Sequence, residues 1–149
     1  MPSLSAVLWV GIGSQRGVAM STLAASVQQC LQQHHLPIAV IAGLATLTSK
    51  ANEPALLALS QAYGWPLLSF TAAELREIAT PNPSVTVAGY TGTPSVAEAA
   101  ALRAARRADP SSQLLIPKQI YRQPRSPYAV TLAIASTQRH AAGAEPSQA

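Results

Sequence analysis

Three short segments of the first half of the chain have the pattern of strands. Residues 6–12 form a continuous apolar run of strand length, and 38–42 and 65–70 are predicted as a second and a third strand. Parallel strands covered on both faces have such uninterrupted apolar sequences. We therefore expect a buried parallel strand over 6–12, followed by strands over 38–42 and 65–70.

Helical spacing fills the segments that lie between and after these runs. Residues 21–33 place Leu23, Val27, Cys30 and Leu31 on one face and glutamines on the other. A second helix is predicted from about residue 53 to 63, with Asn52 as its cap and Gly64 as its stop. Two more helices are predicted over 71–78, which opens with a Thr-x-x-Glu capping box, and over 95–108, which is rich in alanine.

The second half of the chain adds a long loop and two more strands. Residues 80–94 carry several prolines and glycines and predict a loop, with a brief extended piece at 85–87. Strands are expected over 113–116 and 128–135, joined by a mobile surface loop. Because no helix separates them, we expect these two strands to pair antiparallel.

Alternation of strands and helices predicts an α/β fold. We expect a three-layer sandwich in which helices flank a mixed, mostly parallel sheet of about five strands. The domain is predicted to span residues 1–137, and residues 138–149 are predicted to form a flexible tail. A chain of 149 residues is long enough to bury such a core.

Charge and cysteine content narrow the classes of partner. Ten basic residues face six acidic ones, which gives a formal net charge of +4. This balance suits a polycarboxylate, a phosphate metabolite or a nucleic acid. The chain has one cysteine, no apolar run near the roughly 20 residues that span a bilayer, and no charged region ahead of Leu8. We therefore expect a cytoplasmic protein with no membrane partner.

Two glycine turns carry the clearest candidate chemistry. The first, from Gly11 to Gly17, follows the first strand and contains Gly13, Ser14 and Arg16. The second, from Gly92 through Thr93 to Ser95, precedes the alanine-rich helix. Backbone N–H groups at helix N-termini bind anions. We therefore expect a ligand with several negative groups, although an ordinary strand–helix turn explains the first motif equally well.

Further candidates follow the second and fifth strands. Lys50 and Glu53 could face a ligand, with Lys50 gripping an acidic group and Glu53 performing acid–base chemistry; helix-dipole stabilisation by Glu53 is the simpler explanation. Ser95 and Glu98 have the spacing of a capping box, which accounts for Glu98 more simply than catalysis does. Lys118 lies in a basic segment that contains tyrosines. Such a segment can bind a flat acidic molecule or a single-stranded nucleic acid.

Other chemistries are not expected. The first glycine turn misplaces the third glycine of a dinucleotide fingerprint, and no acidic residue follows the second strand to hold a ribose. The histidines have no partners at metal-ligand spacing, so we expect neither a metal site nor a cofactor. Cys30 is predicted to be a packing residue. A nucleic-acid-binding module is the weakest alternative, since the basic residues form no continuous stripe.

Taken together, these motifs resemble the CobE/CbiG C-terminal family of cobalamin biosynthesis. The matching segments occur in the same order and extend over about residues 6–135: Gly11–Gly17, Lys50–Pro54, Pro81–Ser84, Gly92–Ala99 and Leu115–Lys118. The resemblance implies a mixed α/β fold and a precorrin or corrin intermediate as ligand, with other enzymes of the corrin pathway as further partners. Such an intermediate is a flat macrocycle with acidic arms, which suits the glycine turns together with Arg16, Lys50 and Lys118.

The resemblance also leaves two functions open. Two-domain members of the family open the lactone of cobalt-precorrin-5A and release acetaldehyde, which implies a hydrolase acting at a C–C bond. This chain shows no counterpart of their preceding domain and is more similar to the stand-alone members. We therefore expect binding of the intermediate, with lactone opening by Lys50 and Glu53 as the alternative.

Overall fold

The computed structural model describes residues 6–80, 85–86, 89–90 and 95–137. Five strands form a mixed sheet in the order β3-β2-β1-β7-β6. Their bounds are β1 (Leu8–Ser14), β2 (Ile41–Leu47), β3 (Leu67–Phe70), β6 (Gln113–Arg122) and β7 (Ala129–Ser136). β1 pairs in parallel with β2, and β2 with β3, whereas β7 lies antiparallel to both β1 and β6. All the strands of this sheet except β7 therefore run in one direction, as the mixed, mostly parallel prediction requires.

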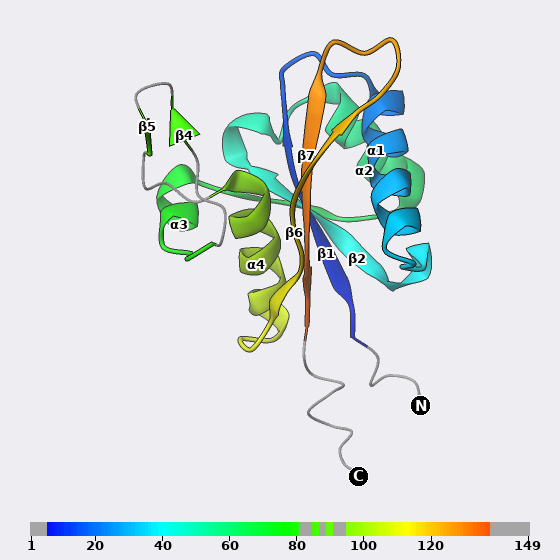
Figure 1. Cartoon of the computed structure of the whole chain (residues 1–149). Coiled ribbons are helices and arrows are strands. Elements are labelled where there is room, and N and C mark those ends of the chain that lie inside the picture. The colour runs from blue at the N-terminus through cyan, green and yellow to red at the C-terminus, as the bar shows by residue number, and fades with distance from the viewer. Residues whose placement is uncertain (1–5, 81–84, 87–88, 91–94, 138–149) are drawn as a thin grey trace.

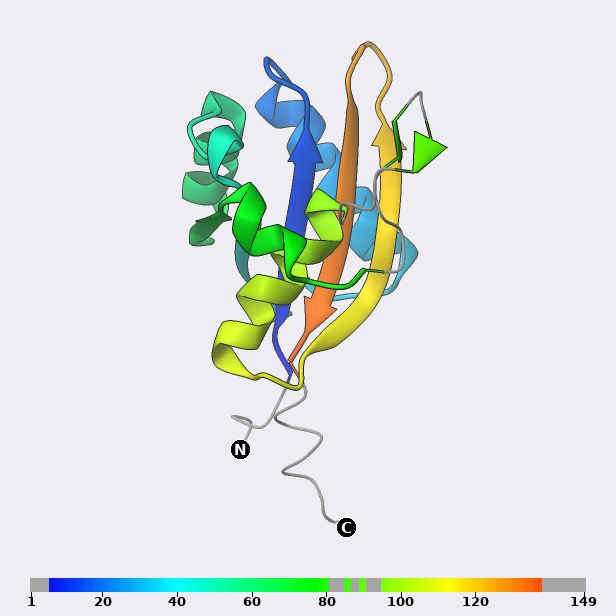
Figure 2. The same ribbon diagram turned by 90° about the vertical axis from the view of Figure 1, so that its left-hand side faces the viewer.

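Helices cover both faces of this sheet, which gives the predicted three layers (Figures 1 and 2). One face is covered by α1 (Met20–Gln33) and α2 (Pro54–Tyr63), and the other by α3 (Ala72–Arg76) and α4 (Val96–Ala108). A separate two-stranded ribbon, β4 (Val85–Thr86) with β5 (Gly89–Tyr90), lies in the segment between α3 and α4. The fold class is confirmed.

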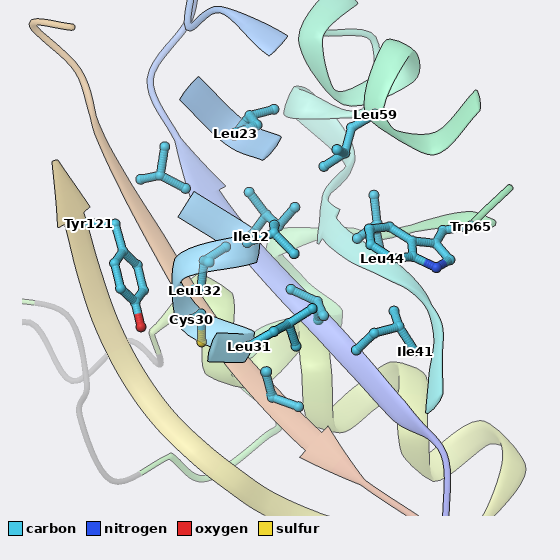
Figure 3. Close-up of a cluster of buried hydrophobic side chains, with 14 of the residues drawn as sticks. Ile12, Leu23, Cys30, Leu31, Ile41, Leu44, Leu59, Trp65, Tyr121 and Leu132 are labelled. Carbon is cyan, nitrogen blue, oxygen red and sulfur yellow. The ribbon is translucent and has the colours of Figure 1, made fainter. Parts of the chain in front are cut away.

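Large aliphatic side chains fill the layer between the sheet and the helices α1 and α2 (Figure 3). Leu23 of α1 and Leu59 of α2 are fully buried there together with Ile12, Leu44 and Leu132 of the sheet. Their removal from water is the main stabilising contribution on this face. The predicted inner face of α1 is confirmed, because Leu23, Val27, Cys30 and Leu31 are all buried.

Alanines fill the layer between the sheet and α4. Ala97, Ala99, Ala100, Ala101, Ala104 and Ala105 are all buried. The helix lies so close to β1 that a Cβ atom on Gly11 would stand 1.9 Å from the backbone oxygen of Ala97. Such an approach leaves no room for any side chain at Gly11.

Several predicted boundaries need correction. The second strand begins later than expected, because the 3₁₀ turn η2 (Ile38–Val40) occupies the start of the apolar run and β2 continues to Leu47. The cap of α2 is Glu53, whereas Asn52 was predicted. The segment 117–127 is not all loop, since β6 extends to Arg122. The Thr71–Glu74 capping box, the stop at Gly64 and the antiparallel pairing of the last two strands are confirmed.

β6 forms one edge of the sheet and is irregular. Its pairing with β7 shifts register between Leu114 and Ile116 and again between Ile116 and Gln119. Pro117 lies inside the second irregularity, at a position where a strand can lack a donor. These shifts turn the backbone of Lys118 out of the regular ladder.

Candidate functional site

The connections that carry most of the predicted site residues lie at one edge of the sheet. β1 ends at Ser14, which pairs with Val130 at the beginning of β7. The β1–α1 connection therefore lies beside the β6–β7 hairpin, as both views show (Figures 1 and 2). Parallel sheets bind ligands at the carboxyl ends of their strands. We call this edge, formed by residues 14–18, 48–53 and 123–128, the open edge.

The first glycine turn is held in place by the connection between β2 and α2. Gly17 adopts a φ of +87°, a conformation that favours glycine. Its backbone N–H donates a 2.9 Å hydrogen bond to Oε1 of Glu53. Glu53 is only 9% exposed, so its carboxylate is a tie between the two connections. Arg16, next to Gly17, is exposed and directed to solvent.

Lys50 and Glu53 lie one turn apart, but their side chains do not pair. The 3₁₀ turn η3 (Thr48–Lys50) ends at Lys50, whose backbone oxygen accepts a 3.0 Å hydrogen bond from the Glu53 N–H. The Lys50 side chain is half-buried and has no ion pair among the described residues. The geometry gives Glu53 a positioning role, and its acid–base role stays a prediction.

The second glycine turn is described only from Ser95, because Gly92 and Thr93 lie outside the described residues. Ser95 caps α4 as predicted, and its side chain accepts a 3.4 Å hydrogen bond from the Glu98 N–H. The Glu98 carboxylate, however, reaches across to β6. Its Oε2 accepts a 2.8 Å hydrogen bond from the backbone N–H of Lys118.

Glu98 is fully buried, and sequence reasoning missed the role of its side chain. The residue was predicted to complete a capping box, whereas its carboxylate fixes the displaced backbone of Lys118. A signal was available, because Glu98 is the one charged residue in the alanine run 97–101. A carboxylate on a buried helix face needs a donor, and a bulge supplies one.

Gly11 and Gly13 differ although they stand two residues apart on β1. Gly11 is buried beneath α4, and close packing accounts for the absence of a side chain there. A Cβ on Gly13 would meet only the Thr131 Cβ, at 3.7 Å, which is an ordinary contact. Ser14 follows, and its Oγ is buried without a hydrogen-bond partner. Of these three residues, packing explains Gly11 alone.

A pocket of about 360 Å³ lies at the open edge, between the first turn of α1 and the β6–β7 hairpin. It is lined by Gly17, Ala19, Ser21, Thr22 and the hairpin residues 124–128. Neither Ser95 nor Lys118 lines it. The predicted meeting of the two glycine turns in one cavity involves Gly92 and Thr93, so it stays a prediction.

The acidic residues of the described chain are all engaged. Glu53 and Glu98 accept backbone N–H groups, and Glu74 and Glu77 both pair with Arg103, at 3.5 and 3.9 Å. Asp109, at the far end of α4, accepts hydrogen bonds from Ser111. Arg16, Lys50, Lys118 and Arg125 have no ion pair within the described part of the chain. Arg16, Lys50 and Arg125 therefore give the open edge a positive charge, and Lys118 adds another on strand β6.

Cys30, metal-binding clusters and membrane spans bear on other kinds of function. Cys30 is buried, and burial raises the pKa of its thiol, which disfavours the thiolate and agrees with a packing role. No cluster of three metal-binding side chains occurs among the described residues. None of the described helices is both long and apolar enough to cross a membrane.

Comparison with known proteins places the chain in a family. A family model described as cobalamin synthesis G C-terminus matches residues 8–135. The chain is 31% identical over 96 residues to a cobalt-precorrin-5A hydrolase of Priestia megaterium. The aligned segment covers 64% of this chain and 26% of that protein. It is also 35% identical over 102 residues to Protein CobE of a Sinorhizobium species, and this aligned segment covers 67% of this chain and 66% of that protein.

A solved structure agrees with these matches. The crystal structure of CobE, a protein from the cobalamin (vitamin B12) biosynthetic pathway, has a TM-score of 0.74 and 31% identity. The match covers 91% of this chain and 98% of that one. The chain thus spans about a quarter of the hydrolase relative and 66% of the CobE relative. It belongs to the CobE/CbiG C-terminal family, and it is a cobalamin biosynthesis protein of that type.

Proposed function

We propose that this chain binds a precorrin or corrin intermediate of cobalamin biosynthesis at its open edge. The observation that carries the proposal is the separation of charge. Each acidic side chain of the described residues is hydrogen-bonded or ion-paired, whereas Arg16, Lys50 and Lys118 have no ionic partner there. A surface that presents cations without competing carboxylates suits a ligand rich in acids.

The proposed ligand has matching chemistry. Precorrin and corrin intermediates are flat macrocycles rimmed with acetate and propionate arms, so one molecule can engage several cations at once. Charge-assisted hydrogen bonds from Arg16, Lys50 and Lys118 would each hold one carboxylate. The Glu53 and Glu98 ties fix the backbone that carries these side chains, so less conformational entropy is lost on binding.

Absorbance titration with hydrogenobyrinic acid tests the proposal. We expect saturable binding in the micromolar range, weakened about tenfold by the double substitution of Arg16→Gln with Lys118→Gln. Arg107→Gln is the matched control, because Arg107 is exposed in the last turn of α4, away from the open edge. Absence of binding at high micromolar ligand, or equal loss in the control, would contradict the proposal.

Lactone opening is the second candidate function. It is supported by the identity of 31% to the cobalt-precorrin-5A hydrolase and by the place of Lys50 and Glu53 at the open edge. Acetaldehyde release from cobalt-precorrin-5A is the direct assay. If Glu53 acts as the base, Glu53→Gln abolishes turnover; unchanged turnover would remove Glu53 from catalysis.

A further inference from the structure

The pocket at the first turn of α1 is a preformed cavity, because hydrogen bonds fix its opposite wall. The β6–β7 hairpin arches over α1, and Gln123 donates from Nε2 to Gln29 Oε1 at 2.9 Å and to Ser26 Oγ at 3.3 Å. At the end of β6, the Tyr121 hydroxyl donates to Gln33 Oε1 at 3.0 Å. These bonds hold the hairpin at a fixed separation from α1, so the cavity needs no rearrangement to form.

Helix α1 presents unused backbone donors to this cavity. Its cap residue is Ala19, whose methyl side chain cannot accept a hydrogen bond from the first N–H groups, and its first turn contains no acidic residue. Within the described structure, the N–H groups of Met20 and Ser21 form no hydrogen bond. The positive end of the helix dipole adds to their attraction for an anion.

Unpartnered hydroxyl groups provide a second, independent observation. Thr22 lines the cavity and is only 7% exposed, yet its hydroxyl forms no hydrogen bond among the described residues. The Oγ1 atom of Thr22 is not completely enclosed by protein. Among the described residues, Ser14 Oγ is the one completely enclosed side-chain oxygen or nitrogen that has no hydrogen-bond partner. The small exposed part of Thr22 therefore faces the cavity that this residue lines.

Tyr128 provides another such donor. Its hydroxyl, also without a described partner, lies 3.6 Å from the place a Cβ would take on Gly17. The Ser21 N–H and the hydroxyls of Thr22 and Tyr128 thus lie around one space, and none of them has a partner among the described residues.

Charge and size define the ligand that fits. Arg125 lines the same cavity and adopts a φ of +66°, a costly backbone conformation for a residue with a side chain. None of the described residues that line the cavity is acidic. A volume of about 360 Å³ is at the lower end for a small-molecule site, so it suits one acidic arm and not a whole macrocycle.

We propose that Thr22, Arg125, Tyr128 and the first turn of α1 form a carboxylate subsite that takes one acidic arm of the ligand. This inference rests on the proposed corrin binding, and it adds Thr22, which the sequence analysis did not select. A carboxylate accepts several hydrogen bonds at once, and the cavity offers the backbone N–H groups, two hydroxyls and a guanidinium. The hydrogen bond from Gly17 to Glu53 fixes the backbone of Gly17, which lines this subsite.

Substitutions that remove one oxygen each test the subsite with little change in volume. We expect Thr22→Val combined with Tyr128→Phe to weaken hydrogenobyrinic acid binding about tenfold, since two hydrogen bonds are lost. Tyr63→Phe is the matched control, because Tyr63 ends α2 and its hydroxyl bonds to Gln28 elsewhere. A corrin whose arms are amides should bind the wild type and the double variant equally.

A second measurement separates the subsite from the proposed function. Sodium propionate, titrated against ¹⁵N-labelled protein, should shift the amide signals of Met20 and Ser21, and the double variant should abolish the shift. If propionate shifts them but the corrin does not bind, corrin binding is wrong and the carboxylate subsite stands. If the corrin binds wild type and double variant equally, the subsite is wrong and corrin binding stands. If inorganic phosphate shifts these signals and propionate does not, the assignment to a carboxylate is overturned.

Discussion

On the face of the sheet covered by α1 and α2, leucines and isoleucines fill the gap, whereas α4 meets the other face through alanines and a glycine. Large side chains hold α1 away from the sheet, and small residues at its first turn leave space for the pocket. Close approach of α4 instead brings the Glu98 carboxylate within reach of the Lys118 backbone. The comparison teaches that side-chain size sets where this fold can have a cavity.

The largest expected effect comes from adding one methyl group on the α4 face. Gly11→Ala should lower the free energy of unfolding by about 4 kcal/mol, because its Cβ meets backbone atoms of α4, which no rotamer change can move. Gly13→Ala is the matched control and should change stability by less than about 0.5 kcal/mol. Urea unfolding followed by circular dichroism measures both. Equal effects at the two glycines would contradict the close approach of α4.

Removing volume is the corresponding test on the other face. Leu56 is fully buried on the inner face of α2, and Leu56→Ala should cost about 3 kcal/mol through lost burial and the cavity left behind. The same denaturant titration applies, with Leu57→Ala as control, since Leu57 is 47% exposed on the same helix. A loss below about 1 kcal/mol at Leu56 would show that the aliphatic layer collapses around the gap.

The Glu53 and Glu98 carboxylates, which accept hydrogen bonds from Gly17 and Lys118, should differ in their contribution to stability because they differ in burial. Glu98→Gln should cost about 2 kcal/mol, since the charge-assisted bond to Lys118 weakens and a buried amide needs new partners. Glu53→Gln, at the rim, should cost about 1 kcal/mol. Thermal unfolding of the two variants ranks them. A larger loss at Glu53 would reverse the order of the two ties.

The smallest effect is expected at Glu74, which helps to hold α3 against α4. The N–H of Thr71 donates to its carboxylate and, with smaller contributions from the Thr71 hydroxyl and Arg103, lowers its pKa below the ordinary 4.5. The resulting stability is present above pH 4.5 and is lost as the pH falls through the lowered pKa. Melting temperatures of Glu74→Gln and wild type should therefore converge in acid. A constant difference down to pH 3 would argue against this pairing.

The sequence predicted correctly those features of the fold that depend only on neighbouring residues. The capping box at Thr71, the glycine stop at residue 64 and the apolar face of α1 depend on neighbours in sequence, and all are confirmed. The extension of β6 beyond Pro117 was missed because proline and arginine favour a loop locally. Pairing with β7, which is distant in sequence but lies beside this segment in the sheet, overrides that preference.

The site was harder to predict because its contacts cross long sequence distances. The Glu53–Gly17 bond joins residues 36 positions apart, and the hairpin approaches α1 only once β7 has paired with β1. Thr22 was not selected, since a threonine in a first helical turn carries no local mark of a ligand. The basic segment containing Tyr128 was noticed from its composition, but its position over Gly17 follows only from the fold.

Pro117 has a consequence for the protein in a crowded solution. A ten-residue strand at the edge of a sheet, with Leu115 and Ile120 exposed, is the kind of template on which other chains add strands and aggregate. The missing N–H of proline and the shifts in register around it interrupt the row of groups that an incoming strand would need. The same irregularity that presents the Lys118 amide to Glu98 therefore also protects this edge against self-association into fibres.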